Sequence, residues 1–478
     1  MSAIITEKFR QHNATQFHES FTEASGNTYY LMIGKSSPFT SATSGGTDDS
    51  PPTPADDVTS ELYTFDSGIA AKKIASTNIT FAIPRRDHST STVYDKYEHN
   101  ISSSNTTDSG ATNLFDSTFY FRTSANRVYK VLDNGSNGTM SAEPTAEDAG
   151  IITQDNYKLL YMYTITAAEQ QAFLTTDFMP VSTDSTVSAR ATDGKIEDTV
   201  IIVAGGTGGT DGTHTGVDIR GDGTGGKATV VISSNTVSSV TVTTAGSGYT
   251  FATISDADIN TAGGGSLSGS NLNVIIGPKG GHGSNAVDEL GGHYVMLQSS
   301  LEGADSDDFL TANDFREISL LVDPTNYGTS TVASATTLRN TYAMKFSGSP
   351  GTFTADEKIS QATTGAIGKV VEYDSTLQIL YYVQERFGDH GTNSSTGAYV
   401  AFSGATTVTG ASSGATGTPD ADADSAVSLA GGATITFTDG HANPELQPDS
   451  GNIIYRELRK PISRATDQTE DIKVIVEF

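Results

Sequence analysis

The part of this sequence that comes nearest to a known catalytic pattern is GDGTGGKA, residues 221–228. It has the spacing G-x-x-x-x-G-K of loops that cradle phosphate groups. Such a loop also needs a Ser or Thr hydroxyl after the lysine and a helix whose first amides face the phosphates. Residue 228 is alanine, and the following TVVISSN is β-branched and typical of a strand. The sequence therefore predicts a turn between strands and no bound nucleotide.

Candidate metal ligands are carboxylates in the glycine-rich part of the chain. Asp211, Asp218 and Asp222 offer the hard oxygen atoms that calcium prefers, and one calcium ion among these loops is an alternative that the sequence leaves open. Residues 420–431 begin like an EF-hand loop but lack its glycine at the sixth position and its glutamate at the twelfth. The prediction is that no metal or other cofactor is bound.

The histidines and carboxylates give no specific signal of zinc catalysis or glycoside hydrolysis. His282 and His293 stand beside glycines, which predicts exposed loop histidines instead of zinc ligands. The 56 acidic residues supply too many carboxylate pairs for any one to indicate glycoside hydrolysis. We therefore expect a protein that is not an enzyme and takes no small-molecule substrate.

The most informative charged residues lie in IPRRD, residues 83–87. Pro84 closes a strand-like run, and Arg85, Arg86 and Asp87 follow directly. Arginine forks can bind a free carboxylate or phosphate. They can equally pair with acidic groups inside the protein or between subunits, and so acidic a chain favours that second interpretation. The four residues are predicted to be structural or interface residues.

Charge and composition exclude several classes of partner. The 478 residues contain 28 Lys and Arg against 56 Asp and Glu, for a net charge of −28. Such a surface repels nucleic acid and anionic lipid. There is no cysteine, and neither a signal-like segment nor a run of about 20 apolar residues appears. We expect no nucleic-acid partner and no membrane partner.

Short runs of Val, Ile, Thr and Tyr between glycine-rich turns predict a mainly β fold. The strand-like runs are residues 28–34, 78–84, 117–123, 127–133, 158–165, 196–206, 237–247, 272–281, 314–324, 377–384 and the alternating last eight.

Three helices are predicted in loops between these strands. Residues 13–26 place two phenylalanines four apart, residues 56–69 begin with Asp56 or Asp57 as a cap, and residues 166–178 begin with a capping box.

The sequence twice becomes rich in glycine between short strand-like runs. This change predicts a layered β-sandwich core interrupted by two small glycine-rich β domains. The predicted divisions are 1–194 and 291–330 for the first two core parts, 195–290 and 331–445 for the inserted domains, and 446–478 for the C-terminal core strands.

Several motifs resemble one protein family in their order and position. These are IPRRD after a strand, FREISLLVDP at 315–324, and SGNIIYRELRKPISRATDQTEDIKVIVEF at 450–478. Together they resemble the gene-8 type baseplate wedge proteins of T-even-like contractile-tailed bacteriophages. The resemblance covers about half of the chain, and it adds Asp467, Gln468 and Phe478 to the structural or interface candidates.

The resemblance implies an elongated β-sandwich that forms a homodimer and joins other baseplate wedge proteins in the virion tail after assembly in the bacterial cytoplasm. The expected function is structural: the subunit would hold its wedge neighbours together and rearrange on contraction. The alternative is a receptor-binding tail adhesin that grips glycans with aromatic side chains of the inserted domains, such as Tyr249, Tyr381, Tyr382 and Tyr399.

Overall fold

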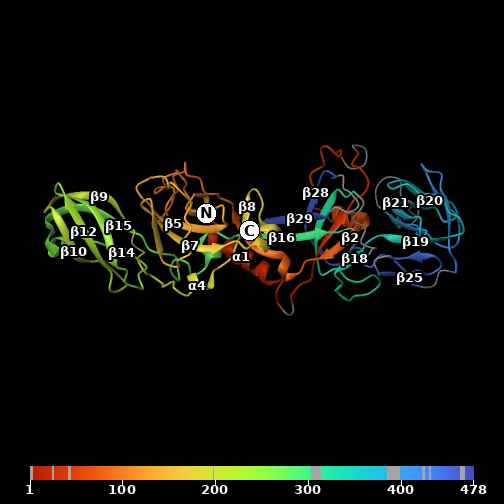
Figure 1. The fold of residues 1–478 in the computed structure, drawn as a ribbon. Coiled ribbons are helices and arrows are strands. Elements are labelled where there is room, and N and C mark those ends of the chain that lie inside the picture. Colours follow the sequence, from red (N-terminus) through yellow and green to blue (C-terminus); the bar gives the residue numbers. More distant parts are fainter. Residues whose placement is uncertain are drawn as a thin grey trace. The chain divides into compact units, whose positions relative to one another are not determined.

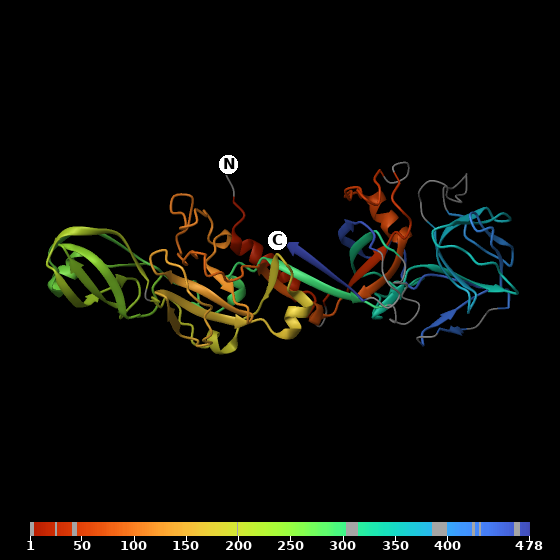
Figure 2. The ribbon, with the colours of Figure 1, turned by 45° about the horizontal axis from the view of Figure 1, so that its top comes forward.

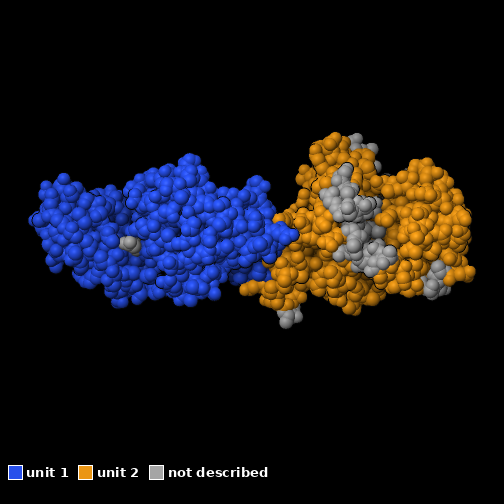
Figure 3. All heavy atoms as spheres, viewed as in Figure 1, with its two compact units in different colours: residues 1–18, 80–296, 475–478 blue, residues 19–79, 297–474 orange. Residues whose placement is uncertain are grey.

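The computed structural model of the chain describes residues 4–23, 26–40, 45–197, 199–302, 314–384, 399–422, 426–429, 432–462 and 469–478. The chain forms two compact units, coloured separately in Figure 3. Unit 1 comprises Met1–His18, Thr80–Met296 and Ile475–Phe478. Unit 2 comprises Glu19–Ile79 and Leu297–Val474. Each unit is thus assembled from segments that are far apart in the sequence.

The described residues are mainly β, as predicted, and the helices are short (Figure 1). The α-helices are α1 (Glu7–Glu19), α2 (Val58–Ser67), α3 (Ala167–Phe173), α4 (Ser185–Ser188), α5 (Asp256–Ile259) and α6 (Ala286–Glu289). Single turns of other helix types are η1 (Ser76–Asn78), η2 (Leu114–Asp116) and η3 (Asn260–Gly264).

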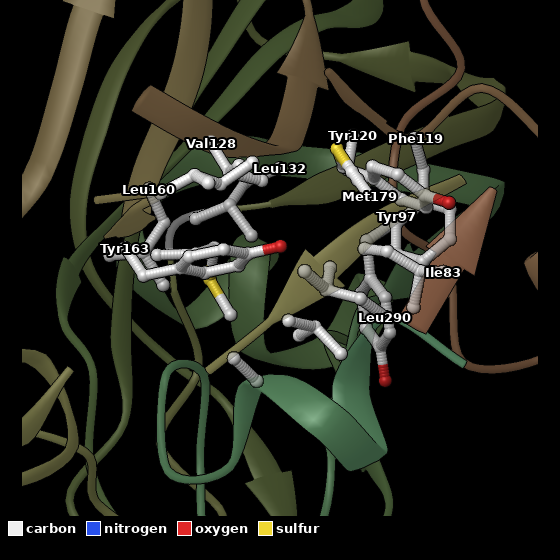
Figure 4. Close-up of a cluster of buried hydrophobic side chains, with 14 of the residues drawn as sticks. Ile83, Tyr97, Phe119, Tyr120, Val128, Leu132, Leu160, Tyr163, Met179 and Leu290 are labelled. Atoms are coloured by element: carbon white, nitrogen blue, oxygen red, sulfur yellow. The ribbon is translucent and has the colours of Figure 1, made fainter. Parts of the chain in front are cut away.

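Two sheets form the sandwich of unit 1. One has the order β4 (Tyr120–Arg122), β5 (Arg127–Asn134), β7 (Tyr157–Thr164), β6 (Ile151–Gln154). The other has the order β29 (Glu470–Glu477), β16 (Tyr294–Leu301), β3 (Ile79–Pro84), β8 (Phe178–Val181), and its first two strands continue into unit 2. A buried cluster takes side chains from both sheets, including Ile83, Met179, Val128 and Leu160 (Figure 4). The shared cluster shows that the sheets are packed face to face.

Both faces of the β5–β7 layer are covered. Val128 and Leu132 of β5 point into the cluster between the sheets, whereas Tyr129 and Val131 belong to a second buried cluster on the opposite face. Alternation of side chains along a strand requires this division. The strand is therefore apolar at most successive positions, and its one buried charged residue is Lys130, at its centre.

The first of the two glycine-rich regions lies in unit 1. It consists of two sheets around a separate buried hydrophobic cluster, within residues 196–276. The sheets have the orders β10 (Gly212–Asp218), β12 (Lys227–Ser233), β13 (Thr236–Thr244) and β11 (Arg220–Gly221), β14 (Ala252–Thr253), β15 (Gly265–Val274), β9 (Val200–Gly209). A Cβ atom on Gly205 of β9 would lie 2.2 Å from the Thr236 hydroxyl of β13. The glycine in this alternating run therefore permits the close approach of the two sheets.

Unit 2 contains a five-stranded antiparallel sheet. Its order is β18 (Thr337–Arg339), β2 (Gly68–Lys73), β1 (Tyr29–Gly34), β17 (Glu317–Val322), β28 (Asn452–Leu458). Tyr30, Met32 and Leu321 lie in its buried cluster together with Phe65 of α2.

The second glycine-rich region lies in unit 2 and is closed differently. Its order is β22 (Ile379–Val383), β21 (Ala366–Asp374), β20 (Lys358–Gln361), β23 (Val408–Gly410), β24 (Thr416–Pro419), β19 (Tyr342–Ser347), β27 (His441–Ala442). β19 also pairs with β22, so six strands form a closed ring around Phe346 and its neighbours. A short hairpin of β25 (Ala426–Ser428) and β26 (Thr434–Thr436) accompanies it.

Local predictions of helix starts agree with the structure, with one exception. Asp57 caps α2 by accepting the amide of Ser60, and Thr166 caps α3 in a capping box. The first helix was wrongly placed at 13–26. It spans Glu7–Glu19, and Phe21 stacks on Tyr29 beyond its end, because tertiary contacts and not the phenylalanine spacing determine where α1 lies.

Candidate functional site

The segment 83–87 lies where β3 ends and the chain turns to run beside β4. Pro84 is the last residue of β3. Beyond it, the amide of Arg122 donates to the carbonyl of Arg86 (2.7 Å), and the amide of His88 donates to the carbonyl of Arg122 (2.8 Å). The backbone of β4 therefore positions the charged side chains that follow Pro84.

Arg85, Asp87 and Arg122 form a hydrogen-bonded cluster. Nε and Nη2 of Arg85 donate to Oδ2 of Asp87 at 3.0 and 2.7 Å, and Nε of Arg122 donates to its Oδ1 at 2.8 Å. Nη1 of Arg85 donates to the carbonyl of Thr175 (2.7 Å). Partial burial acts to raise the pKa of Asp87, but the bonds from the two guanidinium groups outweigh it and hold that pKa below its usual value. The Arg85 fork is thus occupied by groups of its own chain.

Arg86 has contacts of another kind. Its Nη2 donates to the carbonyl of Phe115 (2.9 Å), and its guanidinium carbon lies 4.4 Å from the ring centroid of Tyr120. The Tyr120 hydroxyl in turn donates to the carbonyl of Pro84 (2.8 Å). Arg86 therefore makes a cation–π contact with Tyr120. This contact and the bond to Phe115 attach the segment after β3 to the sandwich.

His88 extends this site into the core. Its side chain is 2 % exposed, with Nδ1 at 4.0 Å from Oε1 of Glu143. Its ring contacts those of Tyr94 and Phe121 at centroid distances of 5.9 and 5.2 Å. Burial lowers the pKa of His88 and outweighs the opposing effect of the Glu143 carboxylate, so the imidazole is neutral at pH 7.

A second charged cluster of unit 1, around Lys130, is fully buried. Nζ of Lys130 lies 2.8 Å from Oε2 of Glu289, and the two side chains are 0 and 1 % exposed. Nζ also lies 2.9 Å from Nδ1 of His282 and 4.1 Å from the ring centroid of Tyr97. The amide of Gly283 donates to Oε2 of Glu289 (3.0 Å). The cluster ties β5 to the loop that returns from the first glycine-rich region.

Protonation in the Lys130 cluster follows from its burial. Desolvation lowers the pKa of Lys130, while the Glu289 carboxylate opposes this effect. Desolvation and the nearby ammonium group both lower the pKa of His282. A neutral His282 accepts from Lys130 through Nδ1 and carries its proton on Nε2. Sequence reasoning missed this cluster because Lys130 and Glu289 are 159 positions apart.

The end of the chain lies against α1 within unit 1. The amide of Phe478 donates to the carbonyl of His293 (3.2 Å), and its ring centroid lies 5.3 Å from that of Phe17. Nη1 of Arg10 pairs with Oε1 of Glu477 at 3.0 Å. Asp467 and Gln468, the other two candidates from this part of the sequence, lie outside the described residues.

Residues 221–228 form a turn, as predicted. They connect β11 to β12, which begins at Lys227, and the Lys227 ammonium pairs with Asp218. Hydrogen bonds from the Thr250 hydroxyl (2.6 Å) and amide (2.8 Å) lower the pKa of Asp222 to about 2. Across the part of the chain that the structure describes, no three His, Asp or Glu side chains are gathered as a metal site requires.

The histidines and tyrosines singled out in the sequence are less exposed than expected. His282 and His293 do lie in loops, but both are 7 % exposed, so the prediction of exposed histidines was wrong: the loops fold back over unit 1. Tyr249, Tyr381 and Tyr382 are buried. The Tyr399 hydroxyl donates to Asp66 (2.7 Å) and is part of unit 2. The three buried rings leave no face on which a sugar could stack.

The fold is that of a β-rich protein, and the charged groups of these clusters bind one another. The family model described as bacteriophage T4, Gp8 matches residues 3–139, which include α1, β1 to β5 and the segment 83–87. This match confirms the resemblance to the gene-8 type baseplate wedge proteins and supports a structural role in the tail baseplate of a T4-like phage. A search of curated proteins finds no match. Among the described helices, none has the length and apolar character that crossing a membrane requires.

Proposed function

We propose that this chain is a structural subunit of a contractile-tail baseplate wedge, which holds neighbouring wedge proteins together and rearranges on contraction. The observation that carries the proposal is the Gp8 match over residues 3–139. The match includes the strands that position Arg85, Arg86 and Asp87, so the best-defined charged site lies in the part of the chain most similar to that family.

The chemistry of the clusters supports a role without catalysis. The Arg85 fork is occupied by Asp87 and Thr175, and Lys130 is enclosed in the core. A catalytic group must reach its substrate, whereas these groups contact other parts of their own chain. The matching family is a structural one, which agrees with this interpretation.

The proposal extends to self-association and to the division of the chain. We infer a homodimer that assembles with other wedge proteins in the host cytoplasm, with Pro84 to Asp87 and Phe478 at or near its contacts. The inserted domains proposed at 195–290 and 331–445 each contain a buried cluster of their own. Each also contributes to a cluster outside its own, because Ile275, Ala286 and Leu290 pack between the sandwich sheets and Leu338 packs with the five-stranded sheet.

Co-assembly tests the function directly. The full chain is produced together with the other baseplate proteins of its phage, and the complexes are separated by sedimentation and located in the tail by electron microscopy. We expect the chain in a wedge complex and its density in the peripheral baseplate. If it remains free in every combination, or lies at the fibre tips, the proposal is wrong. The adhesin alternative loses the tyrosines that suggested it, because three of them are buried and Tyr399 is bonded to Asp66.

A further inference from the structure

The start of the first helix and the residues before it place three large apolar side chains in solvent. Ile4, Ile5 and Phe9 are 85, 67 and 53 % exposed. The residues that α1 buries are Gln11 and Ala14. A surface helix normally turns its apolar stripe to the core and its polar face to water. In α1, Phe17 follows this arrangement, with its ring centroid 5.3 Å from that of Phe478, whereas Phe9 near the start of the helix stays in water.

Polar contacts attach the start of α1 to the rest of unit 1. Nζ of Lys8 lies 3.2 Å from Oδ2 of Asp288, and Nε2 of Gln11 donates to the Asp288 carbonyl (2.9 Å). Arg10 pairs with Glu477 at 3.0 Å. Lys8, Arg10 and Gln11 lie within one turn near the start of α1, and their bonds attach this turn to α6 and to the end of β29. The apolar residues cannot turn inward unless the bonds break.

The exposed residues form one continuous group. Ile4 and Ile5 directly precede Thr6, whose carbonyl accepts the amides of Phe9 and Arg10 at the start of the helix (3.0 and 3.2 Å). In Figure 2 the residues before α1 lead away from the body of unit 1. Contiguous exposed apolar side chains of this kind mark interaction sites.

We propose that Ile4, Ile5 and Phe9 are the anchor by which this chain docks into an apolar groove of a different baseplate protein. The inference rests on the proposed function and specifies one of its contacts. A helix start with apolar residues about one turn apart is the form that groove-binding segments take.

Area and charge favour a different protein over a second copy. A dimer of two chains must overcome the mutual repulsion of two net charges of −28 with a large interface. Three side chains cover only a fraction of the ~800 Å² that each partner buries in a standard interface. The flanking carboxylates of Asp288 and Glu477 are already paired with Lys8 and Arg10, so the surroundings of the three apolar side chains are close to neutral and suit an apolar groove.

Binding by purified partners tests the inference. Each of the other baseplate proteins of the same phage is titrated against the full chain, as wild type and as the triple variant Ile4→Ser, Ile5→Ser, Phe9→Ser. We expect the Kd for one partner to rise ~100-fold or more, as for the loss of a central apolar anchor. Amide exchange across residues 4–12 should slow in the wild-type complex.

The matched control is Val203→Ser with Phe251→Ser, because both residues are 61 % exposed and lie elsewhere in unit 1. This control should leave every Kd within ~3-fold of wild type. Far-ultraviolet circular dichroism checks that both variants fold. Partner binding that the triple variant leaves unchanged overturns the inference but not the proposed function. If no baseplate protein binds the wild type, both are overturned, and if the triple variant loses only self-association, the occupant is a second copy and the inference is wrong.

Discussion

Two charged clusters of unit 1 have similar chemistry and opposite surroundings. In one, Asp87 accepts from Arg85 and Arg122, and its side chain is 46 % exposed. In the other, Glu289 accepts from Lys130, and both side chains are at most 1 % exposed. Water reaches Asp87 in the first cluster, although Arg122 is only 9 % exposed, whereas the second cluster is surrounded by His282, Tyr97, the Ser284 hydroxyl and backbone amides.

The comparison indicates that the surroundings of an ion pair determine how much stability is lost when one partner is removed. An exposed pair contributes little, because each charge is well solvated when the partner is absent. A buried pair contributes little in net terms as well, but losing one partner leaves an unsolvated charge and is therefore costly. Four measurements can break or sharpen this comparison.

The largest effect is expected for Glu289→Ala. It leaves Lys130 buried without its counter-ion and should lower the free energy of unfolding of the sandwich by ~3–5 kcal/mol. Amide exchange of β5 and β7 measures this change. The control is the double variant Glu289→Leu with Lys130→Met, which removes both charges and should unfold within ~1.5 kcal/mol of wild type. Equal losses of unfolding free energy in the single and double variants would contradict the assignment of Lys130 and Glu289 as a buried ion pair.

Acid should destabilise the buried cluster before the exposed one. Burial and Lys130 lower the folded-state pKa of His282, so below pH ~6.5 the unfolded chain binds a proton that the folded chain does not. Stability is therefore lost as the pH falls from ~6.5, by up to ~1.4 kcal/mol per pH unit for this one group. Thermal unfolding at pH 7 and pH 5 measures the loss.

The variant His282→Gln should reduce the slope of the unfolding free energy against pH by the contribution of one proton. His88→Gln should reduce the slope by less, because burial also lowers the pKa of His88 but the Glu143 carboxylate opposes this effect, whereas Lys130 adds to it at His282. A slope that His282→Gln leaves unchanged would show that other groups cause the acid sensitivity.

Asp87→Asn should have a smaller effect, of ~1 kcal/mol, since its carboxylate is nearly half exposed. Its pKa is lowered in the folded state, so its contribution is complete above pH ~3.9 and is lost only as the pH falls through the folded-state value. Amide exchange of β4 measures it. A loss between pH 7 and pH 5 would contradict the role given to this carboxylate.

The smallest effect is expected for Arg10→Gln. The pair of Arg10 with Glu477 has side-chain exposures of 36 and 56 %, so its loss should cost less than ~0.5 kcal/mol. Exchange of α1 amides should accelerate slightly at low salt and not at all in 1 M NaCl, where such pairs are screened. Acceleration by more than ~10-fold would show that this pair alone holds α1 in place.

Local features of the fold could be predicted well from the sequence. The caps of Asp57 and Thr166, the turn before Lys227 and the alternation of the last strand each depend on residues within a few positions of one another. The start of α1 and the burial of His282 and His293 could not, because they depend on segments that meet only after folding.

The charged sites divide in the same way. Arg85 and Asp87 are two residues apart, so their pairing could be anticipated from IPRRD, although the sequence did not indicate that Arg122 would join them. Nothing in the sequence near Lys130 pointed to Glu289 or His282, since a lysine amid apolar residues reads only as an interruption of a strand.

By itself the sequence determined the class of the fold, the positions of most strands, an acidic charge of −28 and the resemblance to a baseplate family, because these depend on composition and on neighbours along the chain. Tertiary structure alone decided which charges are enclosed and which apolar residues stay in water. A side chain's solvation is determined by what packs over it, and in this protein the covering residues come from segments more than a hundred positions away.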